Sequence, residues 1–332
     1  MNAPVVLAEI SRGKFLESVH FGHAVICDNT GNIIKSWGSP DEIILPRSSC
    51  KMIQALPLIT SGASEAFGLT THQLALACAS HQGAAIHTDA VVKWLENLGL
   101  GDADFRCGAQ VPDDKTAREL LIKSDHIPCQ FHNNCSGKHS GFLTLSKHLK
   151  AGPEYIEVDH PVQRACLEAF EMTINAKSPG FAVDGCSAPN YAASLSSVAR
   201  AMAWFASAAQ RSDRASNAAC KLVDAMRLHP ELVAGEGRAC TELMRAMDGK
   251  VAIKTGAEGV FVAIVPEKKI GIAVKVTDGS CRGSECAIAA LLVAIGVLNP
   301  DHPATKKRMN APITNWRGIE TGFTRPAKDL SL

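Results

Sequence analysis

The sequence predicts an α+β fold in which an antiparallel sheet is flanked by helices and joined by a mostly helical lobe. Strand-like runs rich in β-branched residues occur near both ends of the chain, and turn residues separate them. The middle of the chain instead shows helical periodicity over several long stretches. Strand-like runs are expected at 5–9, 20–27, 33–37, 251–254, 260–265 and 271–276.

The order of these runs predicts how the chain is divided. Residues 1–62 and 250–300 are expected to form the sheet region, because strands from both ends can pair in one sheet. Residues 63–249 are expected to form the helical lobe, and 301–332 a C-terminal tail. The whole is predicted to be one cooperative two-lobed unit, and ligand sites favour the cleft between such lobes.

Composition excludes several classes of function. The 332 residues are 46% hydrophobic and 20% charged, with a net charge of +1. This balance gives no electrostatic footprint for nucleic acid or membrane, and aromatic residues are only 5%. The longest apolar run, 287–298, is too short to span a bilayer. Twelve scattered cysteines without a visible export signal indicate reduced thiols and a cytoplasmic protein.

A serine and a lysine three residues apart mark the point where the first strands give way to a helix. If residues 49–59 are helical, Ser48 and Lys51 lie one turn apart on one face. Ser48 would then sit at a helix N-terminus, and Lys51 could remove its proton. The alternative is a helix cap at Ser48 with Lys51 in solvent, because short motifs recur by chance.

A second motif, Lys254-Thr255-Gly256, ends a late strand. S-x-x-K and K-T-G are two elements of the signature of penicillin-recognising enzymes, and each lies at the matching place along the chain. The third element, S-D-N, is absent. Ser80-His81-Gln82 stands in the helical region instead, which argues against a β-lactamase and is also compatible with an ordinary helix end.

Two cysteine-containing segments could hold a metal ion. Cys135-x-x-Lys138 and Asp184-Gly185-Cys186 together offer two thiolates, with a nitrogen donor from Lys138 or His139. Spacing rules alone favour structural cysteines, because C-x-x-K is not a familiar zinc spacing and lysine must lose its proton to coordinate.

Taken together, these segments resemble the rhizobial-type L-asparaginases (class 3, the asparaginase II family) over nearly the whole chain. The Cys-Ser-Gly-Lys-His and Asp-Gly-Cys segments are the most specific parts of the resemblance. It implies a fold like that of serine β-lactamases and glutaminases. It also implies a homodimer and hydrolysis of L-asparagine to L-aspartate and ammonia. Alternatives are a glutaminase, a penicillin-type serine acyl hydrolase, or a non-catalytic zinc- or ligand-binding protein of this fold.

The resemblance also implies a set of site residues. Catalysis is expected from two Ser–Lys pairs, and a zinc ion near the active site is expected to act other than as the catalytic Lewis acid. The catalytic residues are Ser48, Lys51, Ser80 and Lys254, the zinc ligands are Cys135, Lys138 and Cys186, and the substrate-binding residues are Arg47, Asp184, His139 and Ala257. Ser48 is the preferred nucleophile, with backbone N–H groups of Ser48 and Ala257 as oxyanion donors.

Overall fold

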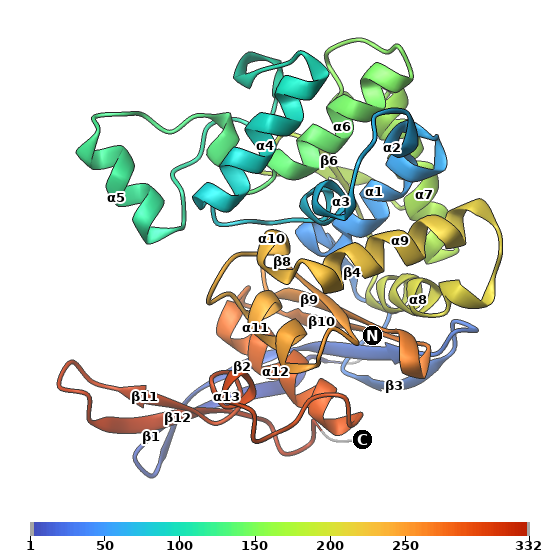
Figure 1. Cartoon of the computed structure of the whole chain (residues 1–332). Helices are drawn as coiled ribbons and strands as arrows, with labels where there is room; N and C mark the ends of the chain where they lie inside the picture. The colour runs from blue at the N-terminus through green and yellow to red at the C-terminus, as the bar shows by residue number, and fades with distance from the viewer. Residues whose placement is uncertain (1–2, 331–332) are drawn as a thin grey trace. The chain divides into compact units, whose positions relative to one another are not determined.

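The computed structural model describes residues 3–330 and confirms the α+β class. An eight-stranded antiparallel sheet runs in the order β11-β12-β1-β2-β10-β9-β8, and β3 pairs with β2 beside this path. The strands are β1 (Val5–Arg12), β2 (Phe15–Cys27), β3 (Ile33–Trp37), β8 (Ala252–Gly256), β9 (Val260–Val265), β10 (Ile270–Val276), β11 (Ala311–Thr314) and β12 (Glu320–Pro326). Strands from both ends of the chain therefore share one sheet, as the sequence predicts (Figure 1).

The chain divides into two compact units, which we call the sheet unit and the helical unit. The sheet unit comprises the described residues up to Ser49, Ala193–Ser207 and the described residues from Glu242 onward. The helical unit comprises Cys50–Ala192 and Ala208–Thr241.

Helices cover both faces of the sheet. They are α8 (Leu195–Ala206), α12 (Cys281–Ala294) and the short α13 (Pro303–Lys306). The part of α11 (Ala239–Ala246) from Glu242 onward also belongs to the sheet unit. Cys27 and its partner Gly271 contact α8, whereas His20 contacts α12. Because alternate strand residues point to opposite faces, α8 and α12 lie on opposite sides. A two-stranded sheet of β4 (Ile43–Ile44) and β7 (Ala193–Ser194) adjoins the start of α8.

The helical unit is organised around α1. Every residue of this helix from Lys51 to Ile59 is buried, so it is a central helix rather than an amphipathic surface helix. It packs against α6, α7 and α9. The helices are α1 (Lys51–Thr60), α2 (Ala63–Ala66), α3 (Thr71–Ala77), α4 (Ala85–Leu98), α5 (Lys115–Lys123), α6 (Ser136–His148), α7 (Pro161–Ile174), α9 (Arg214–Leu228) and α10 (Pro230–Val233), with a hairpin of β5 (Phe181–Val183) and β6 (Pro189–Tyr191).

The observed units differ from the predicted division in three places. Helix α1 belongs to the helical unit, because its surface is covered by other helices. Helix α8 was predicted in the helical lobe but belongs to the sheet unit. Gly271 on β10 has no side chain, so the backbone of α8 can approach this strand closely. The predicted tail supplies β11 and β12, and β12 pairs with β1. Cooperative folding of the two units stays a prediction.

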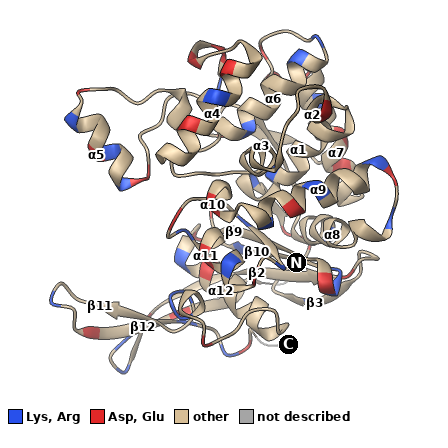
Figure 2. Cartoon of the chain, viewed as in Figure 1, with Lys and Arg blue, Asp and Glu red and all other residues tan. Residues whose placement is uncertain are grey.

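The distribution of charged residues and the hydropathy of the helices agree with the composition of the chain. Lysines and arginines are interspersed with aspartates and glutamates along the elements rather than gathered on one group of them (Figure 2). Within residues 3–330, no helix has the length and apolar character needed to cross a membrane. All twelve cysteines are free thiols.

Replacing Gly271 with alanine is expected to lower the free energy of unfolding by about 1–3 kcal/mol or more. A Cβ atom there would lie 2.2 Å from both Ala199 O and Ala203 N in α8, and backbone atoms cannot rotate away. Gly101→Ala is the matched control, because its backbone is extended (φ −145°) and no atom lies within 4 Å of an added Cβ. Chemical denaturation measures both, and equal stabilities would contradict the assigned α8–β10 contact.

Candidate active site

In the sheet unit, the segment around Ser48 is a short 3₁₀ turn, Arg47–Cys50, that precedes α1. The helix predicted from residue 49 is therefore present at this position. Residues 49 and 50 belong to the 3₁₀ turn, and the α-helix begins at Lys51. Arg47 has a positive φ of 53°, an uncommon conformation for a residue with a side chain. Ser49 fixes the turn, because its Oγ and its backbone N–H both donate to Pro46 O, at 2.7 and 3.1 Å.

The K-T-G motif lies beside this turn. Lys254 is fully buried on β8, and its Nζ donates to Thr255 O at 2.9 Å. A Cβ atom added to Gly256 would lie 2.6 Å from Pro46 O and 3.2 Å from Ser49 Cβ. Only a glycine allows this approach, so the sheet unit itself brings the end of β8 against the Ser48 segment.

Arg47 also lines a cavity within the sheet unit. The cavity has a volume of about 460 Å³ and mixed charge. Its charged lining consists of Arg47, Lys275, Glu42 and Glu258. His23 lies in the wall, and its Nδ1 accepts a hydrogen bond from the Ser39 N–H at 2.8 Å. Cations and carboxylates within one small cavity suit a ligand that carries both charges.

In the helical unit, the amino group of Lys51 is the centre of a buried polar cluster. Lys51 is 1% exposed, and its Nζ donates to Ala79 O at 2.5 Å, Ser80 Oγ at 3.0 Å and Cys135 Sγ at 3.0 Å. The reading in which Lys51 points into solvent is therefore wrong. A lysine and a serine hydroxyl in direct contact out of water form a pair able to exchange a proton.

The Ser80 segment is held by the chain that follows α3. The helix ends at Ala77, and the Ser80 N–H donates to Val233 O at 2.9 Å. Ser80 therefore lies beyond the helix end, and Gly83 follows with a φ of +72°. Ser80 therefore lies in an irregular segment whose backbone is held in place by hydrogen bonds.

His81 links this segment to the start of α6, a contact that could not be predicted from the motifs. Its Nδ1 accepts from the Gly83 N–H at 3.1 Å, so Nε2 carries the ring proton and donates to Ser136 Oγ at 2.9 Å. Ser136 in turn donates to Phe131 O. The His81 ring also stacks on His87, with centroids 4.8 Å apart.

The predicted metal ligands meet in the same unit. Cys135 precedes α6, Lys138 lies in its first turn, and Cys186 lies in the β5–β6 turn. Lys138 Nζ contacts Cys186 Sγ at 3.0 Å, whereas Cys135 Sγ accepts from Lys51 Nζ at 3.0 Å and donates to Asn134 Oδ1 at 2.9 Å. All three residues are at least 95% buried. Residues 3–330 contain no group of three or more His, Cys, Asp and Glu side chains arranged for a metal ion, so a metal here would require Lys138.

The charges of this cluster depend on one another. The interaction between the two cysteine side chains raises the pKa of Cys135 and lowers the pKa of Cys186 below its ordinary value. Burial alone would lower the pKa of Lys138, but the neighbouring sulfurs raise it above its ordinary value. Because its pKa is raised, Lys138 must release a proton before it can bind a metal.

Asp184 opens the turn that carries Cys186. One carboxylate oxygen accepts from the Gly185 N–H at 2.6 Å, and its charge contributes to the raised pKa of Lys138. Ser187 has a φ of 69° in the same turn. Asp184 therefore has a structural contact beside its predicted role in substrate binding.

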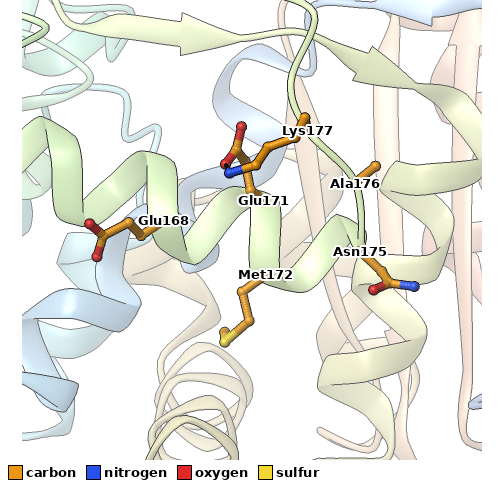
Figure 3. Close-up of a pocket in the computed structure, with 6 residues that line it drawn as sticks. All are labelled: Glu168, Glu171, Met172, Asn175, Ala176 and Lys177. Atoms are coloured by element: carbon orange, nitrogen blue, oxygen red, sulfur yellow. Dashed lines mark hydrogen bonds and ion pairs between the residues drawn. The ribbon is translucent and has the colours of Figure 1, made fainter.

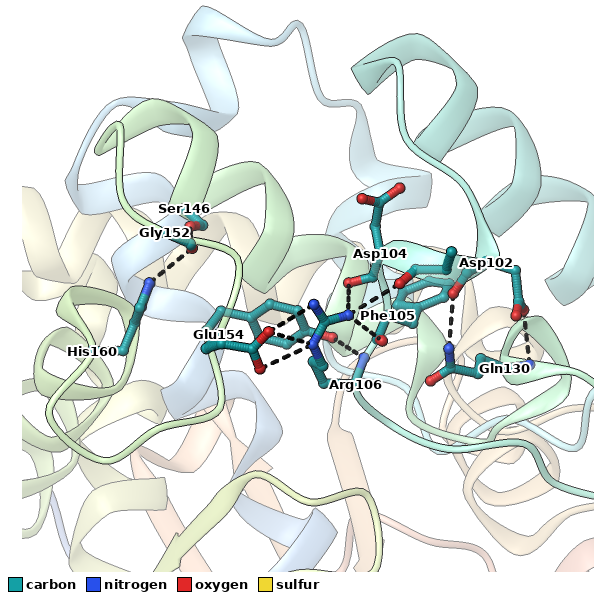
Figure 4. Close-up of polar contacts among 11 residues, drawn as sticks. Asp102, Asp104, Phe105, Arg106, Gln130, Ser146, Gly152, Glu154 and His160 are labelled. Carbon is teal, nitrogen blue, oxygen red and sulfur yellow. Dashed lines mark hydrogen bonds and ion pairs between the residues drawn. The ribbon is translucent and has the colours of Figure 1, made fainter.

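His139 is fully buried next to this cluster. Its Nδ1 lies 2.8 Å from the hydroxyl of Tyr155, which also accepts from the backbone N–H of Arg106 at 2.8 Å. The Arg106 guanidinium is fixed by Glu154 through bonds of 2.8–3.0 Å, as Figure 4 shows. Burial lowers the pKa of His139 to about 4. Tyr155 and Arg106 could not be predicted from the sequence, because these contacts join distant segments.

Another hollow of the helical unit contains none of the predicted residues. It has a volume of about 540 Å³ at the C-terminal end of α7 (Figure 3). Its charged lining includes an ion pair between Lys177 and Glu171, 2.6 Å apart. Lys177 is exposed, so this pair is a surface contact with little energetic weight.

The comparison with protein families decides which family this chain is part of. Residues 8–326 match the family described as L-asparaginase II. The chain belongs to this family. The match supports an asparaginase-type amidohydrolase, in agreement with the resemblance of the motifs. No curated protein sequence matches the chain.

Solved structures similar to this chain are distant. The native form of Mglu is 13% identical over 85% of this chain and 66% of that one, with a TM-score of 0.47. Mglu in its tris and glutamate form is 13% identical over 85% and 60%, with a TM-score of 0.48. A β-lactamase from Mycobacterium bovis is 11% identical over 83% and 95%, with a TM-score of 0.38. The chain thus spans about two thirds or less of the length of Mglu.

The free energy of unfolding is expected to fall as the pH drops from about 6.5 to about 4 with a chelator present. Burial lowers the pKa of His139 to about 4 and that of His81 well below 6.5, so the unfolded chain binds protons that the native state does not. Each such histidine contributes a slope of about 1.4 kcal/mol per pH unit within this window. Above pH 6.5 this contribution is fully present and constant.

Denaturation curves at a series of pH values measure this slope. His81→Gln removes one titrating group, so the slope of the variant should be smaller than that of the parent protein. A free energy of unfolding that stays constant between pH 6.5 and 4 would contradict the burial of neutral histidines.

Proposed function

We propose that the protein is an L-asparaginase that hydrolyses L-asparagine to L-aspartate and ammonia through serine and lysine side chains. Membership of the L-asparaginase II family supports the reaction class. The observation that supports serine–lysine chemistry is the contact of 3.0 Å between Lys51 Nζ and Ser80 Oγ, made by a lysine that is 1% exposed. This contact pairs Lys51 with Ser80, and the pairing of Lys51 with Ser48 stays a prediction. A structural protein would gain little from burying this amino group.

In the proposed first step, Ser48 Oγ attacks the side-chain amide carbon of asparagine and passes its proton to Lys51. The oxyanion that forms on the amide oxygen accepts hydrogen bonds from the backbone N–H groups of Ser48 and Ala257. The C–N bond then breaks. Ser80 and Lys254 supply the proton with which the amide nitrogen leaves as ammonia.

In the second step, water attacks the resulting ester of Ser48. The water gives one proton to the Ser80–Lys254 pair, which lost one to the ammonia; the ester C–O bond breaks, and Ser48 takes back its proton from Lys51 as L-aspartate is released. The pairing of Ser80 with Lys254 stays a prediction. Because Lys51 contacts Ser80, Ser80 is the second candidate for the nucleophile.

For the substrate's α-groups, we propose Arg47 as the partner of the carboxylate and Asp184 as a partner of the ammonium. Arg47 is supported by the charged cavity that it lines. His139 was predicted to join this substrate-binding group, but its hydrogen bond to Tyr155 and its full burial favour a different role.

We also propose that Cys135, Lys138 and Cys186 hold a zinc ion. Sulfur and amine are donors that zinc accepts, and Lys138 Nζ lies 3.0 Å from Cys186 Sγ. When bound, the ion would supply a fixed positive charge near the substrate rather than strong Lewis acidity, because two thiolates and an amine donate much charge to it. We further propose that the protein is a homodimer and that it acts in a reducing cytoplasm.

Ammonia release tests the reaction against its rivals. The purified protein should release ammonia from L-asparagine much faster than from L-glutamine, and should leave a chromogenic β-lactam intact. Faster turnover of glutamine would identify a glutaminase. Hydrolysis of the β-lactam alone would identify a penicillin-type hydrolase, and no turnover of any substrate would favour a binding protein.

Replacing Ser48 with alanine is expected to reduce kcat for asparagine about a thousandfold, because the covalent route is lost. Ser49→Ala is the matched control: its hydroxyl only donates to Pro46 O, so kcat should stay within a few-fold while stability falls by about 1 kcal/mol. Steady-state ammonia assays compare the two variants. A Ser48→Ala protein with unchanged kcat would remove Ser48 as the nucleophile.

Replacing Cys186 with serine is expected to abolish stoichiometric zinc in the purified protein and to raise KM for asparagine more than it lowers kcat. Cys166→Ser is the matched control, because Cys166 is also buried in the helical unit but only contacts Gln54 O. Elemental analysis and steady-state kinetics measure both variants. Loss of kcat with substrate binding intact would show that the metal takes part in the chemical step.

A further inference from the structure

We propose that the charged cavity of the sheet unit binds the α-groups of the amino-acid substrate, with Lys275 and His23 as donors to its carboxylate and Glu258 as an acceptor for its ammonium. The cavity has a volume of about 460 Å³, and Arg47 lines it together with these three residues. This size is within the range of small-molecule sites. The inference rests on the proposed asparaginase function and adds three specificity-determining residues to it.

The charges of the lining favour a zwitterion over a simple anion. Arg47 and Lys275 contribute two positive charges, and Glu42 and Glu258 contribute two negative charges. Inorganic phosphate would be attracted by the cations but repelled by the carboxylates. An α-amino acid carries a carboxylate and an ammonium on one carbon, so both kinds of charge in the lining gain a partner. The lining therefore matches the class of substrate that the proposed reaction requires.

Lys275 has donors left for a ligand. It lies on β10, is half-buried, and donates one hydrogen bond from Nζ to the carbonyl oxygen of Glu258. An ammonium group has three N–H donors, so two remain for a carboxylate. Burial, together with the like charge of Arg47, lowers the pKa of Lys275. A bound carboxylate would offset the repulsion between these two cations.

His23 supplies a directed N–H donor in the wall of the cavity. It is 3% exposed, and its Nδ1 accepts from the Ser39 N–H at 2.8 Å. Gly38 allows this contact, because an added Cβ there would lie 2.3 Å from Nδ1. Burial lowers the pKa of His23, so the neutral ring carries its proton on Nε2. Within residues 3–330 no acceptor meets this N–H, and a carboxylate in the cavity can accept it.

Two residues of the lining have uncommon backbone conformations. Arg47 has a φ of 53° and Glu258 a φ of 57°, in a region that residues with a side chain rarely adopt. Such conformations cluster at ligand sites and persist only where the surrounding structure holds them. The hydrogen bond from Lys275 holds the turn of Glu258, and the bonds from Ser49 to Pro46 O hold the turn of Arg47.

The order of the chain places these side chains next to the proposed reacting groups. Arg47 precedes Ser48, the proposed nucleophile, and Glu258 follows Ala257, a proposed oxyanion donor. In asparagine one methylene separates the α-carbon from the amide carbon, so the α-groups must lie close to the attacked carbonyl. Glutamine has one methylene more, which would move its amide carbon away from Ser48. An ammonium has three N–H donors, so a bond to Glu258 leaves donors for Asp184.

Calorimetric titration of the full-length protein with L-aspartate, the proposed product, tests the cavity without turnover. The parent protein should bind it, and Lys275→Met and Glu258→Gln should each raise Kd about 10- to 100-fold, because a charge-assisted hydrogen bond is lost. Lys268→Met and Glu267→Gln are matched controls on an exposed turn outside the lining, and should stay within twofold. No binding of aspartate, binding of inorganic phosphate in its place, or equal Kd values in all five proteins would overturn the inference.

Truncated ligands show which residue holds which group. Succinate lacks the ammonium of aspartate, and β-alanine lacks its α-carboxylate. Glu258→Gln should weaken the binding of aspartate and leave that of succinate unchanged. Lys275→Met and His23→Phe should weaken both and leave that of β-alanine unchanged. Titrations followed by NMR of the ligand measure these Kd values up to the millimolar range. Equal losses for every ligand would show that the variants act through the fold, and would overturn the assignment of the three residues.

Ammonia release separates this inference from the proposed function. In an active asparaginase, Lys275→Met and Glu258→Gln should raise KM for asparagine about 10- to 100-fold, with a smaller effect on kcat. Activity with an unchanged KM in both variants would overturn the cavity assignment and leave the enzyme proposal standing. A protein that releases no ammonia from asparagine but binds aspartate through Lys275 and Glu258 would do the reverse. Circular dichroism confirms that each variant is folded.

Discussion

The helical unit depends on the burial of two lysine amino groups. Lys51 and Lys138 are 1% and 4% exposed, so the hydration of each ammonium must be replaced by protein atoms. Lys51 is satisfied by the Ala79 carbonyl, Ser80 and Cys135, and Lys138 by the sulfur of Cys186. These contacts force four separate chain segments to meet at one point, and the surrounding helices keep water away from them.

The same constraint explains why the cluster is suited to chemistry. Removing one member of a buried network leaves an unpaired polar group, which is costly, whereas the intact network can exchange protons and charge among its members. His81 and Tyr155 extend the network outward through hydrogen bonds of defined direction. Within the sheet unit, Gly256 allows β8 to approach the turn that carries Ser48.

Much of the fold follows from local patterns in the sequence. The β-rich runs predict the central strands, and residues 52–59 predict the core of α1. The place of α8 could not be predicted, because its packing depends on a missing side chain at Gly271, distant in sequence. Strand β12 was also missed. Its pairing with β1 supplies the stability that its own composition does not indicate.

The candidate site divides in the same way. Motifs identified Lys51, Ser80, Cys135, Lys138 and Cys186, and the structure brings these residues together within the helical unit. His81 belongs to the Ser80-His81-Gln82 segment but was assigned no role, and Tyr155 and Arg106 carry no motif, since their roles come from hydrogen bonds between distant segments. Spacing rules argued against Lys138 as a donor, but its contact with the Cys186 sulfur supports it.

The central claim is that asparagine passes through an ester on Ser48, and rapid-quench intact mass spectrometry tests it most directly. Protein mixed with L-asparagine and quenched in acid during turnover should carry one aspartyl group, and digestion should place it on the peptide that contains Ser48. An aspartyl group on the peptide of Ser80 would assign the attack to the other serine. Ammonia release without any covalent adduct, under conditions in which hydrolysis of the ester is rate-limiting, would contradict the account.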